Sequence, residues 1–262
     1  CTLLAVQRKR ERIHFIDVER DGERRRVHGK VWLDGSDLGD LIAAAEAPFR
    51  WGWESREAWN EPSAPPQSRL DQESFFQEQP VQSPTWVVMG QLGGDRPASF
   101  PHPPEAPFQH CTDRFGVDQT ITYGRLPGGL AMLNWPLQGN DWHHGLERSI
   151  SADPSIRAAL DTEMQQHSCR FLRCMERCSE GWLTPGEAFP STTPHLALMP
   201  YWREGRRLRG QAVVTEQDLL PVHDGARRGP LKSSSIAVGT YANDHHYPGE
   251  DWPLAGKSCR WG

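Results

Sequence analysis

Hydrophobic and polar residues alternate along two segments near the start of the chain, RIHFIDVE at 12–19 and RVHGKVWL at 26–33. A period of two is typical of a strand with one buried face. Asp21-Gly22 stands between the segments, and this dipeptide favours the two-residue turn of a β-hairpin. The pattern therefore predicts a hairpin over 12–33.

The predicted hairpin runs into an acidic loop that contains two glycines, DGSDLGD at 34–40. Ser36 or Asp37 can cap a short helix that we expect to reach about Ala47. A helix that begins here presents backbone N–H groups to a phosphate or to the polar edge of a ligand. The loop is therefore either an ordinary helix cap or a ligand-binding loop.

The clearest helical pattern starts at Asp153 and ends before Gly181, with Pro154 at the first helical position. Apolar residues recur along it at helical spacing, and the pattern is interrupted only at His167. The apolar positions are Ile156, Leu160, Met164, Phe171, Met175 and Cys178. We interpret this stripe as core packing and not as a cofactor site.

Proline and glycine are frequent between residues 48 and 130, which predicts irregular connections there. Residues 54–84 are rich in Glu, Gln, Ser and Pro, and we expect them to form a long surface excursion. Strands are predicted at Thr85–Met89, Gln119–Tyr123, Leu130–Trp135, Leu208–Thr215 and Ile236–Tyr241. The mixture of helices and strands predicts an α/β fold with α+β character.

Composition narrows the class of protein. The chain has 262 residues, which is enough for a hydrophobic core, and a formal net charge of -5. The negative charge argues against nucleic acid as the main partner. The sequence contains no run of 18 apolar residues, so we expect no contact with a membrane.

The cysteines indicate a reducing compartment. They stand at positions 1, 111, 169, 174, 178 and 259, and no two of them form a CxxC pair. Three fall on the predicted helix, where Cys174 and Cys178 are one turn apart. We expect free, buried thiols in a cytoplasmic protein.

Two histidine pairs, His143-His144 and His245-His246, each follow an Asn-Asp dipeptide closely. Adjacent side chains diverge and rarely bind one ion, so we expect no metal and predict that one histidine of each pair faces a pocket. The sequence contains no GxSxG, GxGxxG or GxxxxGK[ST] motif. Hydrolase and phosphate-loop chemistry therefore have no motif to support them.

A basic stretch, YWREGRRLRG at 201–210, holds four arginines. It could be a nucleic-acid footprint, a solvated strand or a clamp for an anionic ligand, and the net charge disfavours the first. We expect Arg203 and Arg206 to face inward, and Arg207 and Arg209 to be mainly solvated.

Four stretches follow one another along the chain: VWLDGSDLGDLIAAAEAPFRWGWESREAWNEPSAP, MLNWPLQGNDW, PYWREGRRLRGQAVVTEQDLL and SSSIAVGTYANDHHYPG. In this order they resemble a family of FAD-dependent oxidoreductases with a glutathione-reductase-like FAD domain. The resemblance covers roughly residues 12–60 and 130–262. It implies a partial FAD/NAD(P)-binding Rossmann-like domain with an inserted substrate domain.

The resemblance also implies a domain plan. Residues 1–50 would end the FAD-binding domain with its β-meander, 51–235 would form the substrate domain, and 236–262 would return toward the FAD domain. Family members begin with a glycine-rich FAD fingerprint and end with a segment that closes over the flavin. We expect both parts to lie outside this chain, which would then be an internal fragment with little FAD affinity of its own.

The same resemblance suggests roles for individual residues. Asp34, Gly35, Ser36 and Asp37 would lie near the FAD, with Gly35-Ser36 in place of the Ala-Thr that is common in the family.

A small polar or anionic substrate would transfer a hydride to the flavin in this family. The residues expected to assist are Arg203, Arg206 and Arg207 as anion-binding groups, Tyr201 as a hydrogen-bond donor, and His245 or His246, beside Asp244, as proton acceptor.

Two other functions stay open at this point. Eleven tryptophans suit a non-catalytic module that binds carbohydrate or protein. The histidines could instead serve a hydrolase or lyase.

Overall fold

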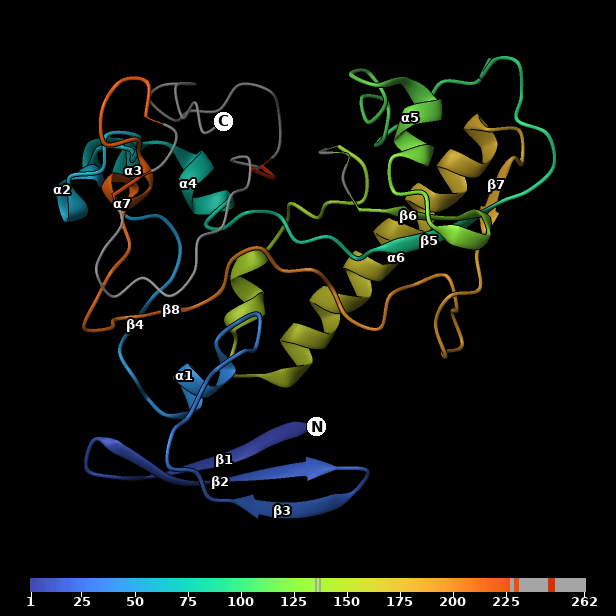
Figure 1. Cartoon of the computed structure of the whole chain (residues 1–262). Coiled ribbons are helices and arrows are strands. Elements are labelled where there is room, and N and C mark those ends of the chain that lie inside the picture. The colour runs from blue at the N-terminus through green and yellow to red at the C-terminus, as the bar shows by residue number, and fades with distance from the viewer. Residues whose placement is uncertain (135, 137, 227–228, 231–244, 248–262) are drawn as a thin grey trace. The chain divides into compact units, whose positions relative to one another are not determined.

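The computed structural model describes residues 1–134, 136, 138–226, 229–230 and 245–247 (Figure 1). The chain forms two compact units. The first contains Cys1–Val81 and the described part of Glu204–Asp244, and the second contains Gln82–Arg203 and the described part of His245–Trp252. Each unit combines helices with small antiparallel sheets, so the mixed α/β class is confirmed. The domain plan of 1–50, 51–235 and 236–262 stays a prediction.

The first unit opens with an antiparallel meander of β1 (Thr2–Lys9), β2 (Arg12–Arg20) and β3 (Glu23–Val27). Asp21 and Gly22 both have positive φ, 53° and 78°, as the predicted tight turn requires. The hairpin is confirmed, but its second strand lies over 23–27 and not over 26–33.

The length of the turn explains why the second strand begins earlier than predicted. A two-residue turn pairs Arg20 with Glu23, so the strand must begin directly after the turn. Val31 and Leu33, which the alternation placed on a buried face, are 77% and 90% exposed.

The polar segment at 54–84, predicted as a long surface excursion, is helical in part. It contains α2 (Arg56–Trp59), α3 (Gln67–Gln72) and α4 (Ser74–Glu78). Leu70 and Phe76 are buried, and Trp53 meets Phe76 edge to face. Each helix is so short that it contributes only one or two apolar residues, which is too few to show a helical period.

Distant segments of the first unit meet in a two-stranded sheet. β4 (Phe49–Arg50) pairs with β8 (Arg207–Leu208), and α1 (Asp40–Ala44) packs beside β1. The strand predicted over 208–215 is therefore wrong beyond its first residue. The chain continues into α7 (Glu216–Leu219), which starts with a capping box between Thr215 and Asp218.

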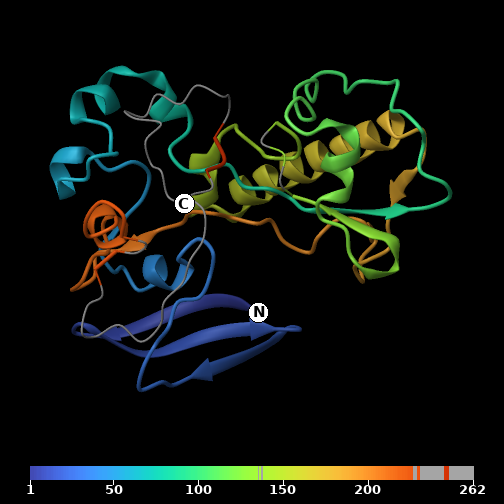
Figure 2. The same ribbon diagram turned by 45° about the horizontal axis from the view of Figure 1, so that its top comes forward.

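The second unit is built on the antiparallel sheet β6-β5-β7 and one long helix (Figures 1 and 2). Its elements are β5 (Val88–Leu92), α5 (Gly116–Thr122), the 3₁₀ helix η1 (Pro127–Gly129), β6 (Leu130–Leu133), the 3₁₀ helix η2 (Leu146–Ile150), α6 (Pro154–Cys178) and β7 (Leu183–Pro185). The strand predicted at 130–135 is confirmed over 130–133, and the one predicted at 85–89 starts only at Val88.

The strand predicted at 119–123 was wrong, because residues 119–122 belong to helix α5. Val117, Thr120 and Ile121 are buried at helical spacing, and that pattern outweighs the β-branched composition. The strand predicted at 236–241 lies outside the described residues.

Helix α6 is confirmed together with its predicted ends. The Asp153 carboxylate accepts a hydrogen bond of 2.8 Å from the Ser155 N–H, Pro154 follows it, and Gly181 has φ 79° beyond the C-terminus. The stripe is core packing, since Leu160, Met164, Phe171, Met175 and Cys178 are buried. Only Ile156, in the first turn, is 40% exposed.

Candidate functional site

The second unit brings the two histidine-containing segments together. Asp141 belongs to the first segment and His246 to the second, and Asp141 Oδ2 lies 2.6 Å from His246 Nδ1. Both residues are almost completely buried, at 1% and 3% exposed. The pair is the centre of a set of polar residues, called here the Asp141 cluster, that consists of Ser83, Thr85, Asp141, His143, Arg203 and His246.

Thr85 organises the cluster through its backbone and its side chain. Its backbone forms antiparallel bridges to both Asp141 and Tyr201. Its hydroxyl donates a hydrogen bond to Asp141 Oδ1. The segment before β5 therefore places Asp141 on one side of Thr85 and Tyr201 on the other.

His246 is held by its backbone as well as by its ring. The Ser83 N–H donates to the His246 carbonyl at 2.7 Å, and the His246 N–H donates to the Gln82 side-chain oxygen at 3.1 Å. These contacts fix the ring over Asp141.

Arg203 supplies the positive charge beside Asp141. Its side chain is 8% exposed, and its Nη1 lies 3.6 Å from Asp141 Oδ1. The same nitrogen donates to the Ser83 carbonyl at 2.5 Å and to Thr85 Oγ1 at 2.9 Å. Its guanidinium carbon lies 4.8 Å from the centre of the Tyr201 ring. Arg203 therefore balances a buried carboxylate, which is costly to leave unpaired.

This arrangement can move a proton. A neutral histidine that donates its Nδ1–H to a buried carboxylate has Nε2 as its basic nitrogen, and the carboxylate stabilises the imidazolium that forms. The Asp141–His246 pair therefore has the geometry of an oriented general base.

One ring of each histidine pair lies in the cluster, and the expectation that this ring faces a pocket stays a prediction. His143 Nδ1 lies 2.5 Å from Ser83 Oγ and is half-buried, whereas His144 is exposed. His245 is half-buried and stacks on Tyr247, and Tyr201 is 51% exposed. Asp244, the expected partner of the histidines, lies outside the described residues.

Sequence reasoning missed Asp141, Thr85, Ser83 and His143 as members of the site. The available signal was the repetition of Asn-Asp shortly before His-His at 140–144 and 243–246. Pairing the aspartate of one repeat with the histidine of the other would have found the central contact.

The predicted ligand loop at 34–37 lies in the first unit. The carboxylate of Asp34 accepts hydrogen bonds from Ser36 Oγ at 2.7 Å, from the Ser36 N–H at 3.0 Å and from the Ile42 N–H at 2.9 Å. Partial burial raises the pKa of Asp34, but these hydrogen bonds outweigh it and the net pKa is lowered.

The cap of α1 differs from the prediction. The residue before the helix is Gly39, at φ 68°, and neither Ser36 nor Asp37 occupies that position. Ser36 Oγ accepts from the Asp40 N–H at 2.8 Å, so Ser36 and Asp34 bind amides of the first turn themselves. The side chains of the loop thus occupy positions at which a phosphate would bind.

The arginines of the basic stretch divide between the two units. Arg206 belongs to the first unit, its side chain is 7% exposed, and it donates to the Leu38 carbonyl at 2.8 Å. A Cβ at Gly39 would lie 3.0 Å from the Arg206 Cβ, so Arg206 supports the acidic loop. Arg207 donates to the Gly52 carbonyl at 2.5 Å and is 39% exposed, and Arg209 is exposed.

In the part of the chain that the structure describes, no group of three or more His, Cys, Asp and Glu side chains could hold a metal ion. No helix there is both long and apolar enough to cross a membrane.

Comparison with known proteins identifies a family. The profile of the family described as FAD dependent oxidoreductase matches residues 1–260. No curated protein and no solved structure matches the chain.

Proposed function

Because the chain belongs to the FAD-dependent oxidoreductase family, we propose that it oxidises a small polar or anionic molecule and that His246, oriented by Asp141, accepts the proton. Proteins of this family are flavoproteins and bind FAD. When bound, FAD supplies the acceptor for a hydride.

We assign the loop at 34–37 to cofactor contact. A Cβ at Gly35 would meet nothing within 4 Å, so a ligand can approach this backbone closely. Asp34, Ser36 and Asp37 offer oxygen acceptors and suit hydroxyl groups of a cofactor. The loop does not suit a pyrophosphate, because its carboxylates repel anions and Asp34 already accepts the Ile42 N–H.

The observation that carries the proposal is the 2.6 Å contact between Asp141 and His246 in a buried, charge-balanced cluster. Substrate oxidation by hydride loss leaves a proton on oxygen or nitrogen, and a positioned neutral histidine can accept it. Arg203 is then a positioning residue that holds Asp141. Tyr201 and His245 remain candidates for substrate hydrogen bonds.

The choice between polar and anionic substrates depends on the arginines. Arg203, Arg206 and Arg207 each contact a carbonyl or carboxylate of the chain itself. Because these arginines already have partners within the chain, a polar substrate has better support than an anionic one.

The rival functions have less support. The buried tryptophans Trp86, Trp182 and Trp202 are unavailable for stacking on a sugar. A hydrolase or lyase would use the same Asp–His pair but would leave a flavin oxidised. We also propose the cytoplasm as location, because the described cysteines are free thiols.

The test is anaerobic mixing of the intact, FAD-loaded protein with a panel of small hydroxy and amino compounds. We expect at least one to bleach the flavin absorbance. Turnover of a panel member without any change in the flavin would favour the hydrolase or lyase.

A further inference from the structure

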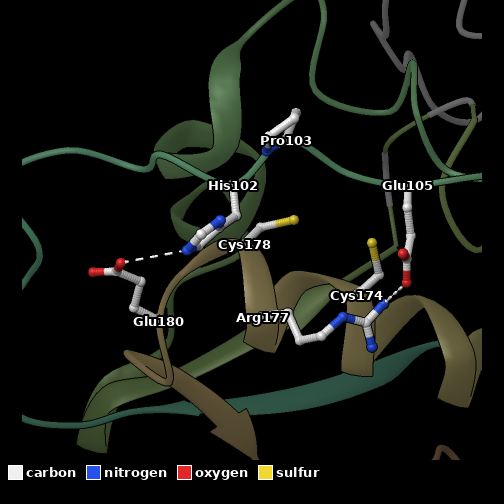
Figure 3. Close-up of a pocket in the computed structure, with 7 residues that line it drawn as sticks. All are labelled: His102, Pro103, Glu105, Cys174, Arg177, Cys178 and Glu180. Atoms are coloured by element: carbon white, nitrogen blue, oxygen red, sulfur yellow. Dashed lines mark hydrogen bonds and ion pairs between the residues drawn. The ribbon is translucent and has the colours of Figure 1, made fainter.

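Helix α6 carries two thiols that lie outside the Asp141 cluster and open into a cavity of about 490 Å³ (Figure 3). The lining residues are His102, Pro103, Glu105, Cys174, Arg177, Cys178 and Glu180. Both sulfurs point from the helix toward the segment of His102 and Glu105 (Figure 3). The thiols are 1% and 2% exposed, so only a small reagent can reach them.

The two thiols stand one helical turn apart on helix α6, and both belong to the lining of the cavity. Both are free thiols, so each can lose its proton to bind an ion. A thiolate is the form of cysteine that binds metals.

The spacing of the pair disfavours a disulfide. Side chains four residues apart on a helix have Cβ atoms about 5–6 Å apart, whereas a disulfide requires about 3.5–4.5 Å. An ion between the sulfurs spans a wider gap, because it contributes two metal–sulfur bonds, each of about 2.3 Å for zinc, in place of one S–S bond of about 2.05 Å.

The surroundings select the kind of ion. A structural zinc site needs four ligands, and no group of three or more ligands exists in the described ranges. The carboxylate of Glu105 pairs with Arg177, and that of Glu180 lies 3.7 Å from His102 Nε2. Two thiolates alone suit a soft ion that accepts two-coordination, and thiolate ligands select Cu(I).

We propose that Cys174 and Cys178 form a two-thiolate site for a soft monovalent cation of the Cu(I) class. Each thiol loses its proton to solvent and forms one bond to the ion. No electron is transferred, and the resulting bis-thiolate complex carries one negative charge. Arg177, in the same cavity, lies beside that charge.

The experiment is an anaerobic titration of the purified full chain with Cu(I) supplied as its coloured bicinchoninate complex. We expect the wild-type chain to remove one Cu(I) from the bicinchoninate complex, with an affinity that an isolated cysteine does not reach. Cys174→Ser and Cys178→Ser should each weaken Cu(I) binding by more than about 100-fold. Loss of a residue that only supports a metal ligand weakens binding by at most about 100-fold, so a larger loss identifies a direct ligand.

Matched controls are Cys169→Ser, on the same helix but outside the cavity lining, and Cys111→Ser, a buried thiol outside that lining. Both should keep the site. Loss of the site in Cys111→Ser, or its retention in Cys174→Ser, would overturn the two-thiol assignment.

A measurement on the wild type does not depend on folding of the variants. X-ray absorption of the Cu(I)-loaded chain should show two sulfur neighbours and no nitrogen or oxygen neighbour. Failure of the wild-type chain to compete for Cu(I), or a copper shell of nitrogen and oxygen, would refute the proposal.

Discussion

Asp141 Oδ2 lies 2.6 Å from His246 Nδ1, although 105 positions separate the two residues in the sequence. Arg203 lies on the other side of the carboxylate, 3.6 Å from Oδ1. The three residues thus form a buried unit in which each charge has a partner. Its stability and its proton chemistry can be tested separately.

Replacement of Asp141 by asparagine should destabilise the fold. The change leaves the buried Arg203 guanidinium without its carboxylate, and breaking a buried ion pair costs about 3–5 kcal/mol. Urea unfolding followed by circular dichroism measures the loss. Asp95→Asn, at an exposed position, is the control and should leave the unfolding midpoint unchanged. Equal midpoints for Asp141→Asn and the wild type would show that the pair adds no net stability.

Replacement of Arg203 by lysine should lower kcat by about 10-fold to 100-fold through misplacement of Asp141. Lysine keeps the charge but lacks the planar group that contacts Ser83, Thr85 and Asp141 together. The pH dependence of kcat should also shift, because His246 loses its fixed partner, whereas KM should change little. A rise in KM alone would instead make Arg203 a substrate-binding residue.

Asp34 should stabilise the first unit only while it is ionised. Its pKa is lowered in the folded chain, so the stabilisation is present above the ordinary value of about 3.9 and is lost as the pH falls through the lower folded value. Asp34→Asn should therefore be less stable than the wild type at neutral pH, and the two should converge under acid. Thermal melts between neutral and acidic pH measure this, and a constant difference would contradict it.

Glu216 should stabilise the first unit by connecting helix α7 to residue 63. Its carboxylate accepts hydrogen bonds from the Ser63 N–H at 2.8 Å and the Ser63 hydroxyl at 2.6 Å, and it is 9% exposed. Hydrogen bonds to charged groups contribute about 1.5–3 kcal/mol each, so Glu216→Ala should lose at least about 2 kcal/mol in urea unfolding. Glu187→Ala, at an exposed position, is the control.

The sequence correctly predicted those elements whose form depends on a few neighbouring residues. The turn at Asp21-Gly22 and the ends of α6 follow from residues within a few positions of each other. The resemblance at the level of short ordered motifs also predicted the family, which the profile over 1–260 confirms.

Long-range packing decided the features that the sequence did not show. Residues 119–122 are β-branched in part, yet Thr120 and Ile121 are buried as members of a helix. The partner of His246 is Asp141 and not an adjacent residue, and only the folded chain reveals that choice. The family resemblance suggested the arginines as anion-binding groups, but their contacts with nearby carbonyl and carboxylate groups could not be read from spacing.

The most direct test of the account is the rate of anaerobic flavin reduction in a single turnover, measured with the intact, FAD-loaded protein and its best substrate from the panel. His246→Gln removes the base, so we expect a fall of about 10²–10⁴-fold. The control His144→Gln, on the exposed ring, should reduce the flavin at the wild-type rate. A wild-type rate in His246→Gln, with FAD bound and the fold intact, would contradict the assignment of His246 as the proton acceptor.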